Sequence, residues 1–490
     1  MTTPASVSFR PFDPAELAQI EGRIVVFADA DGTLDPAARR IDRLTRGAVK
    51  RAVEGEAFED ATPGTSVDLA FPAGLAAEAV QVICLPRRPT AAEARKAGVA
   101  VGRSAGSAAV TLLANARRFA DELALGAVLR GYTYRAQRTG AAADKTAGPV
   151  AVLVSKPGDY EDAADRIAAL AQGVFFTRDL TAAPSNVLTT TEFARQLEGL
   201  RDLGVEVEVL EEAELEELGM RTLLAVGQGS ESPSKVVVMQ WKGAGGDPLA
   251  LVGKGVVFDA GGISLKPAAG MEDMTMDMGG AGVVSGVMKT LALRKAKAHV
   301  VGLVGLVENM PDGRATRPGD VVRSMKGDTV EVINTDAEGR MVLADVLWYA
   351  QERFKPQGVV DLATLTGAIM IGLGHENAGV FSNNDPLCDA FLKAAKAEGE
   401  GAWRMPLGEA YAKQLKSDVA DVKNVGGRPG GAITAAEFLR RFVKDDTPWI
   451  HLDIAGVAKT GGDSAHAGKG VSGWGVLSLD RLVRDRFEGE

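Results

Sequence analysis

Short apolar runs rich in β-branched residues alternate with alanine-rich stretches over the first third of the chain. The runs, each bounded by turn residues, lie at 22–28, 65–72, 78–86 and 148–155. This pattern predicts β-strands. The intervening stretches, chiefly 34–55 and 90–131, place apolar residues at helical spacing. Because strands and helices alternate, we predict a smaller N-terminal α/β domain over residues 1–160.

A breaker sequence, Lys156-Pro157-Gly158-Asp159, separates this region from the rest of the chain. The residues after it carry apolar side chains at helical spacing, which predicts a linker helix over 161–178. A larger C-terminal domain is predicted over residues 179–490. Its strand candidates are 235–242, 248–258, 298–307, 358–365 and 449–454, and its main helix candidates are 281–296, 341–354 and 434–443.

The strand candidates of the second domain are almost continuously apolar, which is typical of a mostly parallel sheet covered by helices on both faces. The predicted fold class is therefore α/β, with a smaller and a larger α/β domain joined by a helix. A length of 490 residues agrees with two or three domains, because single hydrophobic cores stop growing beyond about 250–300 residues.

The composition of the chain mainly excludes classes of protein. Hydrophobic residues make up 46% of the chain and charged residues 24%, as in ordinary globular proteins. No apolar run approaches the ~20 residues that span a bilayer, and the start, MTTPASVSF, lacks the pattern of a secretory signal. Two cysteines, Cys84 and Cys388, are too few for a disulfide framework. We expect a cytoplasmic protein without a membrane partner.

The net charge of −10, from 55 basic and 65 acidic residues, argues against a general nucleic-acid binder. The acidic excess lies beyond residue 160, whereas the first domain is close to neutral. We therefore expect any functional acidic residues to lie in the second domain.

Two motifs of the first domain suggest other enzymes. Residues 29–34 (Asp-Ala-Asp-Gly-Thr-Leu) resemble the first motif of haloacid-dehalogenase-type phosphatases, in which an aspartate after a strand is the nucleophile. The paired carboxylates that such a phosphatase needs later in the domain are missing from 90–160, so a polar turn is the preferred interpretation. Residues 102–106 match the G-x-S-x-G nucleophile elbow, but all four histidines belong to the second domain.

Three segments of the second domain have charged residues within or next to predicted apolar strands and helices, where burying a charge is unfavourable. The first, 252–267, has Lys254 inside an apolar strand that ends at Asp259 and continues to Lys266. The second, 274–280, contains Asp277 before a helix. The third, Asn-Thr-Asp-Ala-Glu-Gly-Arg at 334–340, lies between a strand at 329–333 and the helix 341–354. The ends of parallel strands are where open α/β sheets bind ligands.

Four carboxylates, those of Asp259, Asp277, Asp336 and Glu338, are expected on this rim. Their mutual repulsion requires cations, and two divalent ions would balance four negative charges. Asp336 and Glu338, two residues apart in extended backbone, would point the same way. This arrangement predicts two-metal hydrolysis, in which the ions activate a water and polarise a carbonyl.

Each of these residues also has a structural interpretation. Thr335 and Glu338 have the spacing of a helix capping box, Asp277 could stabilise a helix N-terminus, and Lys254 could extend its amine to solvent. Beside a dication, the neutral amine of Lys254 would instead become a ligand. Lys266 and Arg340 would remain as cations at the rim, suited to an oxyanion or a small anion.

At this point the chain resembles the leucyl (cytosol) aminopeptidase family. The resemblance rests on NTDAEGR at 334–340, GKGVVFDAGGISLKP at 253–267 and DMGGAG at 277–282. It extends to segments at 361–368, 417–439, 451–456 and 177–189, and so covers roughly 175–460, whereas residues 1–160 match only loosely. It implies a metal-dependent aminopeptidase that releases N-terminal residues from peptides.

The resemblance also implies roles for individual residues. A tightly held metal would bind Lys254, Asp259, Asp277 and Glu338, and an exchangeable one Asp259, Asp336 and Glu338. Lys266 and Arg340 would be the catalytic residues, the first stabilising an oxyanion and the second holding a bicarbonate that acts as general base. The pocket for the N-terminal side chain would be formed by Met274, Thr364, Leu365, Gly367 and Ala455.

The sequence departs from the family at Ala260, where serine is common, and over the small polar stretch 457–473. Oxygen ligands and one amine admit Zn²⁺, Mn²⁺, Mg²⁺ and Co²⁺, and among these we expect Mn²⁺ or Zn²⁺. The family implies short peptides with a free N-terminus as substrates and a homohexamer as the assembly. A DNA-binding regulatory role, known for some members, is an alternative that the net charge disfavours.

Overall fold

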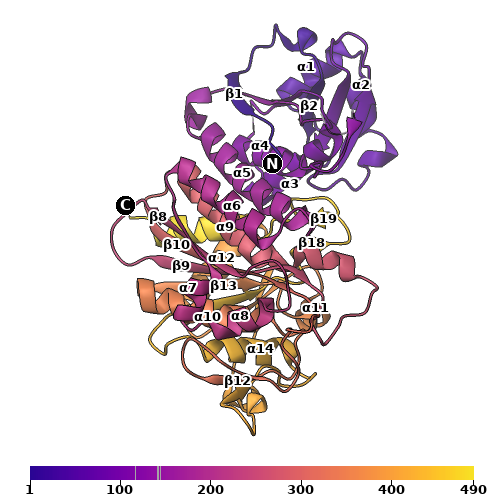
Figure 1. The fold of residues 1–490 in the computed structure, drawn as a ribbon. Coiled ribbons are helices and arrows are strands. Elements are labelled where there is room, and N and C mark those ends of the chain that lie inside the picture. The colour runs from indigo at the N-terminus through magenta and orange to yellow at the C-terminus, as the bar shows by residue number, and fades with distance from the viewer. Residues whose placement is uncertain (116, 141–142, 144, 490) are drawn as a thin grey trace. The chain divides into compact units, whose positions relative to one another are not determined.

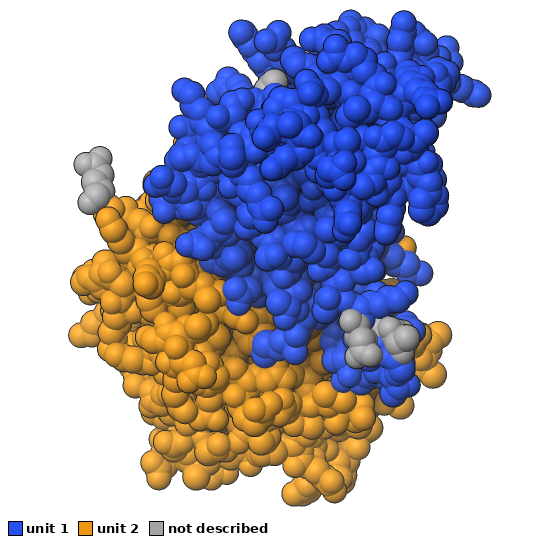
Figure 2. Space-filling model, turned by 90° about the horizontal axis from the view of Figure 1, so that it is seen from above, with its two compact units in different colours: residues 1–175, 462–469 blue, residues 176–461, 470–490 orange. Residues whose placement is uncertain are grey.

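The computed structural model describes residues 1–115, 117–140, 143 and 145–489 (Figure 1). The chain forms two compact units, which Figure 2 colours separately. The first comprises Met1–Phe175 and Gly462–Lys469, and the second Phe176–Gly461 and Gly470–Glu490. The division falls inside helix α5 (Ala163–Ala182). The boundaries predicted from the sequence, at 160 and 178, stay a prediction.

The first unit is built on a six-stranded sheet with the order β1-β6-β5-β2-β4-β3. Its strands are β1 (Val7–Pro11), β2 (Arg23–Ala28), β3 (Ser66–Ala70), β4 (Ala79–Cys84), β5 (Val110–Leu113) and β6 (Val150–Val154). All neighbours are parallel except the edge strand β3, which runs antiparallel to β4. The helices are α1 (Pro36–Leu44), α2 (Ala48–Val53), α3 (Ala91–Ala105) and α4 (Ala120–Arg130).

Neither of the two motifs in this unit forms the site that it suggested. Asp29, which follows β2, lies 3.4 Å from the buried guanidinium of Arg117, which also pairs with Asp35 at 3.2 Å. These contacts fit a structural ion-pair network better than a phosphatase nucleophile. Gly102 lies within α3, and a Cβ there would come 2.3 Å from the carbonyl oxygen of Ala127 in α4. This glycine therefore serves close helix packing, and the elbow interpretation is wrong.

The second unit is built on an eight-stranded sheet with the order β15-β14-β17-β13-β9-β10-β8-β7. Its strands are β7 (Glu206–Leu210), β8 (Lys235–Lys242), β9 (Leu249–Asp259), β10 (His299–Asn309), β13 (Gly358–Ala363), β14 (Ala378–Ser382), β15 (Ala402–Arg404) and β17 (Trp449–Asp453). The four central strands, from β17 to β10, are parallel. Antiparallel pairs occur only towards the edges of this sheet, so the predicted mostly parallel α/β fold is confirmed.

Helices cover both faces of this sheet (Figure 1). One face carries α7 (Glu212–Glu217), α8 (Arg221–Gly227), α10 (Gly339–Phe354) and α14 (Gly431–Arg440). The other carries α6 (Thr190–Glu198), α9 (Gly279–Leu293), α12 (Asp385–Glu398) and α15 (Val476–Arg486). Shorter helices are α11 (Gly367–Leu373), α13 (Glu409–Ala412) and the 3₁₀ helix η6 (Met271–Met278). Small sheets are formed by β11 (Val321–Arg323), β12 (Thr329–Glu331) and β16 (Val422–Lys423), and by β18 (Lys459–Thr460) and β19 (Gly470–Val471).

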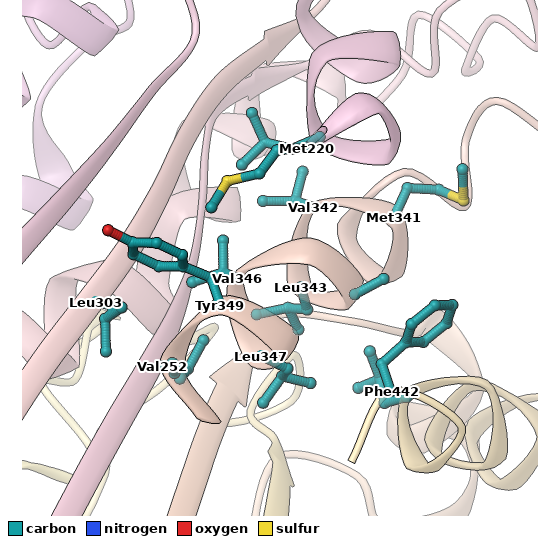
Figure 3. Packing of buried hydrophobic residues seen from close by; sticks show 14 of the residues in the cluster. Met220, Val252, Leu303, Met341, Val342, Leu343, Val346, Leu347, Tyr349 and Phe442 are labelled. Atoms are coloured by element: carbon teal, nitrogen blue, oxygen red, sulfur yellow. The ribbon is translucent and has the colours of Figure 1, made fainter. Parts of the chain in front are cut away.

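The core beneath α10 holds this helix against the sheet (Figure 3). Leu343, Val346 and Leu347 of α10 pack in one buried cluster with Val252 of β9 and Leu303 of β10. Since this packing is apolar and dense, α10 and the ends of the strands are held in a fixed relation. The same packing therefore fixes the positions of the polar segments that adjoin α10 and the strands. Within the described residues, no helix has the length and apolar character that crossing a bilayer demands.

Candidate active site

Three carboxylates meet where the central parallel strands end. Asp259 is the last residue of β9, while Asp336 and Glu338 precede α10. Each offers an oxygen, and these oxygens all lie within 4.8 Å of one another. The carboxyl ends of neighbouring parallel strands share one edge of the sheet. For that reason residues nearly eighty positions apart in the sequence form one cluster.

Asp259 is oriented by donors on both sides. Its Oδ1 accepts hydrogen bonds from the backbone N–H of Gly261 at 2.9 Å and from Nδ2 of Asn309 at 2.7 Å. Asn309 ends the neighbouring strand β10 in register with Asp259. Gly261 has φ +89°, a conformation that glycine adopts without strain. The other oxygen, Oδ2, lies 2.8 Å from Nζ of Lys266.

The backbone around Asp336 differs from the expected extended form, because residues 335–336 make a turn. The capping box is also absent from the described structure, since α10 has Glu338 at its N-cap position without a side-chain capping bond. Thr335 Oγ1 instead donates to the carbonyl oxygen of Gly261 at 2.6 Å and accepts from the backbone of Ser264 at 2.8 Å. The turn, rather than strand alternation, brings Asp336 and Glu338 together.

Asn424 holds this turn from a distant segment and was missed by the sequence analysis. Its Oδ1 accepts from the backbone N–H of Ile333 at 2.9 Å, and its Nδ2 donates to the carbonyl oxygen of Asn334 at 2.7 Å. The side chain is fully buried. Asn309 was missed in the same way, although a polar residue at the end of an apolar strand was a signal that could have identified it.

Lys254 lies between Glu338, one of the three carboxylates of this cluster, and a fourth carboxylate, that of Asp277. Its Nζ donates to Asp277 Oδ1 at 2.8 Å and to the carbonyl oxygen of Thr364 at 3.0 Å, and lies 2.7 Å from Glu338 Oε1. The residue is only 2% exposed, so its amine does not reach solvent. Gly339 makes room for it, because a Cβ there would lie 2.6 Å from Cε of the lysine. Burial disfavours the charged amine and by itself would lower its pKa. The negative charges of Asp277, Glu338 and Asp259 outweigh this effect, so the pKa of Lys254 is raised.

Asp277 is buried in η6 just before α9. Its Oδ1 accepts from Lys254 and also from Thr364 Oγ1 at 2.8 Å. Burial raises its pKa, against the effect of Lys254. Its Oδ2 is buried and has no hydrogen-bond partner among the described residues. The buried carboxylate therefore contacts Lys254 across the cluster and keeps one oxygen free for a further ligand.

Lys266 and Arg340 occupy different positions relative to the cluster. Lys266 pairs with both Asp259 and Asp336; burial opposes its charge, but the nearby carboxylates raise its pKa. Arg340 is buried in the first turn of α10, where its Nη1 donates to the carbonyl oxygen of Asn424 at 2.8 Å. Burial lowers its pKa to about 10. Its Nε is buried without a hydrogen-bond partner in the described part of the chain.

The five residues expected to form a substrate pocket lie on three segments. Thr364 and Leu365 follow β13, and Gly367 begins α11. Ala455 follows β17 and packs in a small buried cluster with Ile369 of α11. Met274 lies in η6, one helical turn before Asp277. The structure thus places Thr364 directly on Asp277, and the other pocket residues on adjoining segments.

The donor set fits divalent cations. Three of the four carboxylates, those of Asp259, Asp277 and Glu338, are buried, and among the described residues the ion-pair partners of the four are Lys254 and Lys266. Burial raises the pKa of Glu338 and of Asp336 as well, which shows how unfavourable the uncompensated charges are. The free oxygen of Asp277 and the three converging oxygens of Asp259, Asp336 and Glu338 provide ligand atoms of the kind that hard and borderline cations prefer.

Comparison with known proteins gives a consistent result. Residues 175–479 match the catalytic domain of the cytosol aminopeptidase family. A probable cytosol aminopeptidase from Cereibacter sphaeroides is 62% identical over 491 residues, covering all of both chains. A mutant of tomato leucine aminopeptidase has a similar structure, with a TM-score of 0.86 and 31% identity over 99% of this chain and 97% of that one. The bottromycin maturation enzyme BotP in complex with Mn gives a TM-score of 0.81 and 35% identity, over 95% and 99% of the two chains.

These matches confirm the resemblance seen in the sequence and give no support to the phosphatase or the DNA-binding alternative. They include the whole length of the curated relative, so the first unit is matched as well as the second. The segment matched by the family contains every residue of the carboxylate cluster. The chain therefore belongs to the cytosol aminopeptidase family and is a metal-dependent aminopeptidase.

Proposed function

We propose that the peptide bond is hydrolysed at the carboxylate cluster, with two divalent ions bound by this chain's own side chains. The observation that carries the proposal is the convergence of Asp259, Asp336 and Glu338 within 4.8 Å. Lys254 and Asp277 adjoin this group through the ion pairs of the lysine with Asp277 and Glu338. The site lies at the edge of a parallel sheet, where α/β enzymes bind their substrates.

The proposed ligand sets share two residues. Lys254, Asp259, Asp277 and Glu338 would hold the tight ion, and Asp259, Asp336 and Glu338 the exchangeable one. The free oxygen of Asp277 supports the first set. When bound, such ions lower the pKa of a water and polarise a carbonyl. We propose Mn²⁺ or Zn²⁺, because oxygen ligands with one nitrogen suit both ions, and a solved relative is a complex with Mn.

The residues at the rim would act on the substrate. Lys266 is only partly buried, and its cation can hold the oxyanion that forms when the carbonyl is attacked. Arg340 would hold a bicarbonate that accepts a proton from the attacking water. The support for this role is its buried guanidinium, whose Nε has no partner among the described residues. A small anion is what such a group would bind.

The substrates would be short peptides with a free N-terminus. Thr364, Leu365, Gly367, Ala455 and Met274 would contact the N-terminal side chain, since they lie on the segments that adjoin Asp277. We further propose a homohexamer located in the cytoplasm. Nucleic acid is not expected as a partner, because the chain carries a net charge of −10.

Removal of single ligands tests the proposal. Asp336→Ala and Glu338→Ala should each abolish peptidase activity, whereas the circular dichroism spectrum should be kept, because neither side chain belongs to the apolar core. Asp312→Ala is a matched control, since this aspartate is exposed and outside the cluster. Full activity in both ligand variants, or loss of the fold together with activity, would refute the assignment.

Anomalous scattering from crystals grown with Mn²⁺ or Zn²⁺ tests the metal assignment separately. Two peaks bounded by the proposed ligands are expected. A single peak, or a peak away from Asp277, would contradict the two ligand sets. Activity of the stripped protein, measured after adding each ion with and without bicarbonate, then shows which ion and which anion support turnover.

A further inference from the structure

Asp453 is a buried carboxylate outside the proposed ligand sets. It is the last residue of β17, in register with Ala363 of the parallel strand β13. Its side chain is fully buried. A buried charge requires strong hydrogen bonds to persist in a fold, so its partners indicate what it is for.

The partners of Asp453 belong to the two segments that follow β13 and β17. Its Oδ1 accepts from the backbone N–H of Leu365 at 3.1 Å and from that of Ala455 at 3.3 Å. Its Oδ2 accepts from Thr366 Oγ1 at 2.6 Å. The same hydroxyl oxygen accepts from the backbone N–H of Ile369 and thereby caps α11. One carboxylate thus connects both segments and the start of a helix.

The segment held in this way contacts the candidate active site directly. The carbonyl oxygen of Thr364, next to Leu365, accepts a hydrogen bond from Lys254 Nζ at 3.0 Å. Its hydroxyl donates to Asp277 Oδ1 at 2.8 Å. Any shift of the backbone at 365–366 would move Thr364, and with it the partners of Lys254 and Asp277.

A second pair of contacts fixes the position of Asp453 itself. His451, two residues earlier on β17, donates from Nδ1 to Asp361 Oδ1 of β13 at 2.5 Å. Trp449 Nε1 donates to the other oxygen of the same aspartate at 2.6 Å. These bonds favour one register between the two strands. A slip by one residue would turn Asp453 to the opposite face of the sheet.

We propose that Asp453 is a positioning residue. By holding Leu365, Thr366 and Ala455 in one arrangement, it fixes Thr364 against Lys254 and Asp277 and sets the shape of the adjoining pocket for the N-terminal side chain of the peptide. The inference rests on the proposed function. Displacements of about 1 Å at such distances from the chemistry lower rates by about a hundredfold.

The test uses three variants of the full-length protein. Thr366→Val keeps the shape of the side chain but removes the hydroxyl that Asp453 binds, and Thr366→Ser keeps the hydroxyl as the matched control. Asp453→Asn removes the charge directly. For each variant, kcat and KM are measured with two dipeptides that differ only in an N-terminal alanine or leucine. The affinity of the stripped protein for Mn²⁺ and the melting temperature are measured alongside.

We expect Thr366→Val and Asp453→Asn to lower kcat/KM by about tenfold or more, by unequal factors for the two dipeptides, and to weaken Mn²⁺ binding. Thr366→Ser should stay close to the wild type. Wild-type kinetics in Thr366→Val would overturn the inference. So would an equal loss for both dipeptides with unchanged Mn²⁺ affinity and a lower melting temperature, because a purely structural role predicts that result.

The two proposals fail in different ways. If the wild type hydrolysed neither dipeptide, the proposed function would be refuted, while the Mn²⁺ affinities of the variants would still decide whether Asp453 positions the site. If Asp453→Asn does not fold, Thr366→Val decides the question alone.

Discussion

Lys254 is the side chain in which structure and chemistry are most closely coupled. It lies between Asp277 and Glu338, and these carboxylates keep its amine protonated in the structure described here. A divalent ion that takes this amine as a ligand must displace its proton. Metal binding should therefore release a proton and weaken as the pH falls.

Lys254→Met tests this coupling. The variant should lose one of two Mn²⁺-binding steps, and the stripped protein should be destabilised by about 3–5 kcal/mol, because Asp277 and Glu338 lose their buried counter-charge. Lys235→Met is a suitable control, since this lysine is buried in the same sheet but pairs with Glu211. Calorimetric titration at several pH values measures both steps, and two unchanged steps in the variant would contradict the ligand role.

Lys266 is expected to act on the substrate rather than on the metal. Lys266→Ala should lower kcat by ~10²–10³, the usual effect of removing one oxyanion donor. The metal content should stay at two ions per chain, because Asp259 and Asp336 keep their oxygens. Steady-state kinetics together with metal analysis check this. A normal kcat with altered metal content would show that the roles of the two lysines are exchanged.

Among the helices, α15 depends on a residue that is remote in sequence. Glu400, fully buried, accepts hydrogen bonds from the backbone N–H groups of Gly475 at 2.8 Å and Ser478 at 2.9 Å. These groups belong to the start of α15, which needs acceptors there. Burial raises the pKa of Glu400 to about 7, despite these bonds.

A pH dependence of stability follows from that shift. The protonated form of Glu400 is favoured in the fold, so its contribution is fully present below the ordinary pKa of 4.5 and is lost as the pH rises through about 7. Between pH 5 and 8 the wild type should lose stability relative to Glu400→Gln, by a total on the order of 3 kcal/mol. Thermal unfolding of both proteins across this range measures the difference.

Glu409→Gln is the control for this experiment, because Glu409 is exposed and pairs only with Lys413 on its own helix turn among the described contacts. Its unfolding curve should shift with pH in parallel with that of the wild type. If the Glu400→Gln curve also ran parallel to the wild type, the carboxyl of Glu400 would not titrate in this range.

For the assembled protein, a homohexamer predicts a mass six times that of the 51.1 kDa chain. In the proposed assembly we expect exposed apolar side chains of the second unit to be covered, among them Ile371, which is 90% exposed, and Trp403, which is 62% exposed. Light scattering coupled to size-exclusion chromatography measures the mass directly, and a monomer at micromolar concentration would refute the proposal.

Much of the fold could be predicted because the local pattern of apolar and polar residues indicates which segments are buried. The apolar run 235–242 coincides with β8, and the predicted strand at 248–258 differs from β9 by one residue at each end. The short strands β1, β5, β7 and β14 were not predicted from the sequence. They have four or five residues, but β3, β6 and β17 have five and were predicted, so length alone is not the reason; the pairing partner decides whether such a short segment becomes a strand.

By itself, the sequence determined the α/β class, the family and the types of side chain available for chemistry, because apolar runs and long ordered motifs are local properties. Only the tertiary structure decided how the site is held. Asn424 and Asp453 come from segments far from the carboxylates, and hydrogen bonds across that distance leave no trace in local spacing. The turn at 335–336 has a local hydrogen bond, from the backbone N–H of Asp336 to Asn334 Oδ1, but its contacts with Gly261 and Asn424 come from distant segments. Such contacts form only when the parallel strands bring their carboxyl ends to one edge of the sheet.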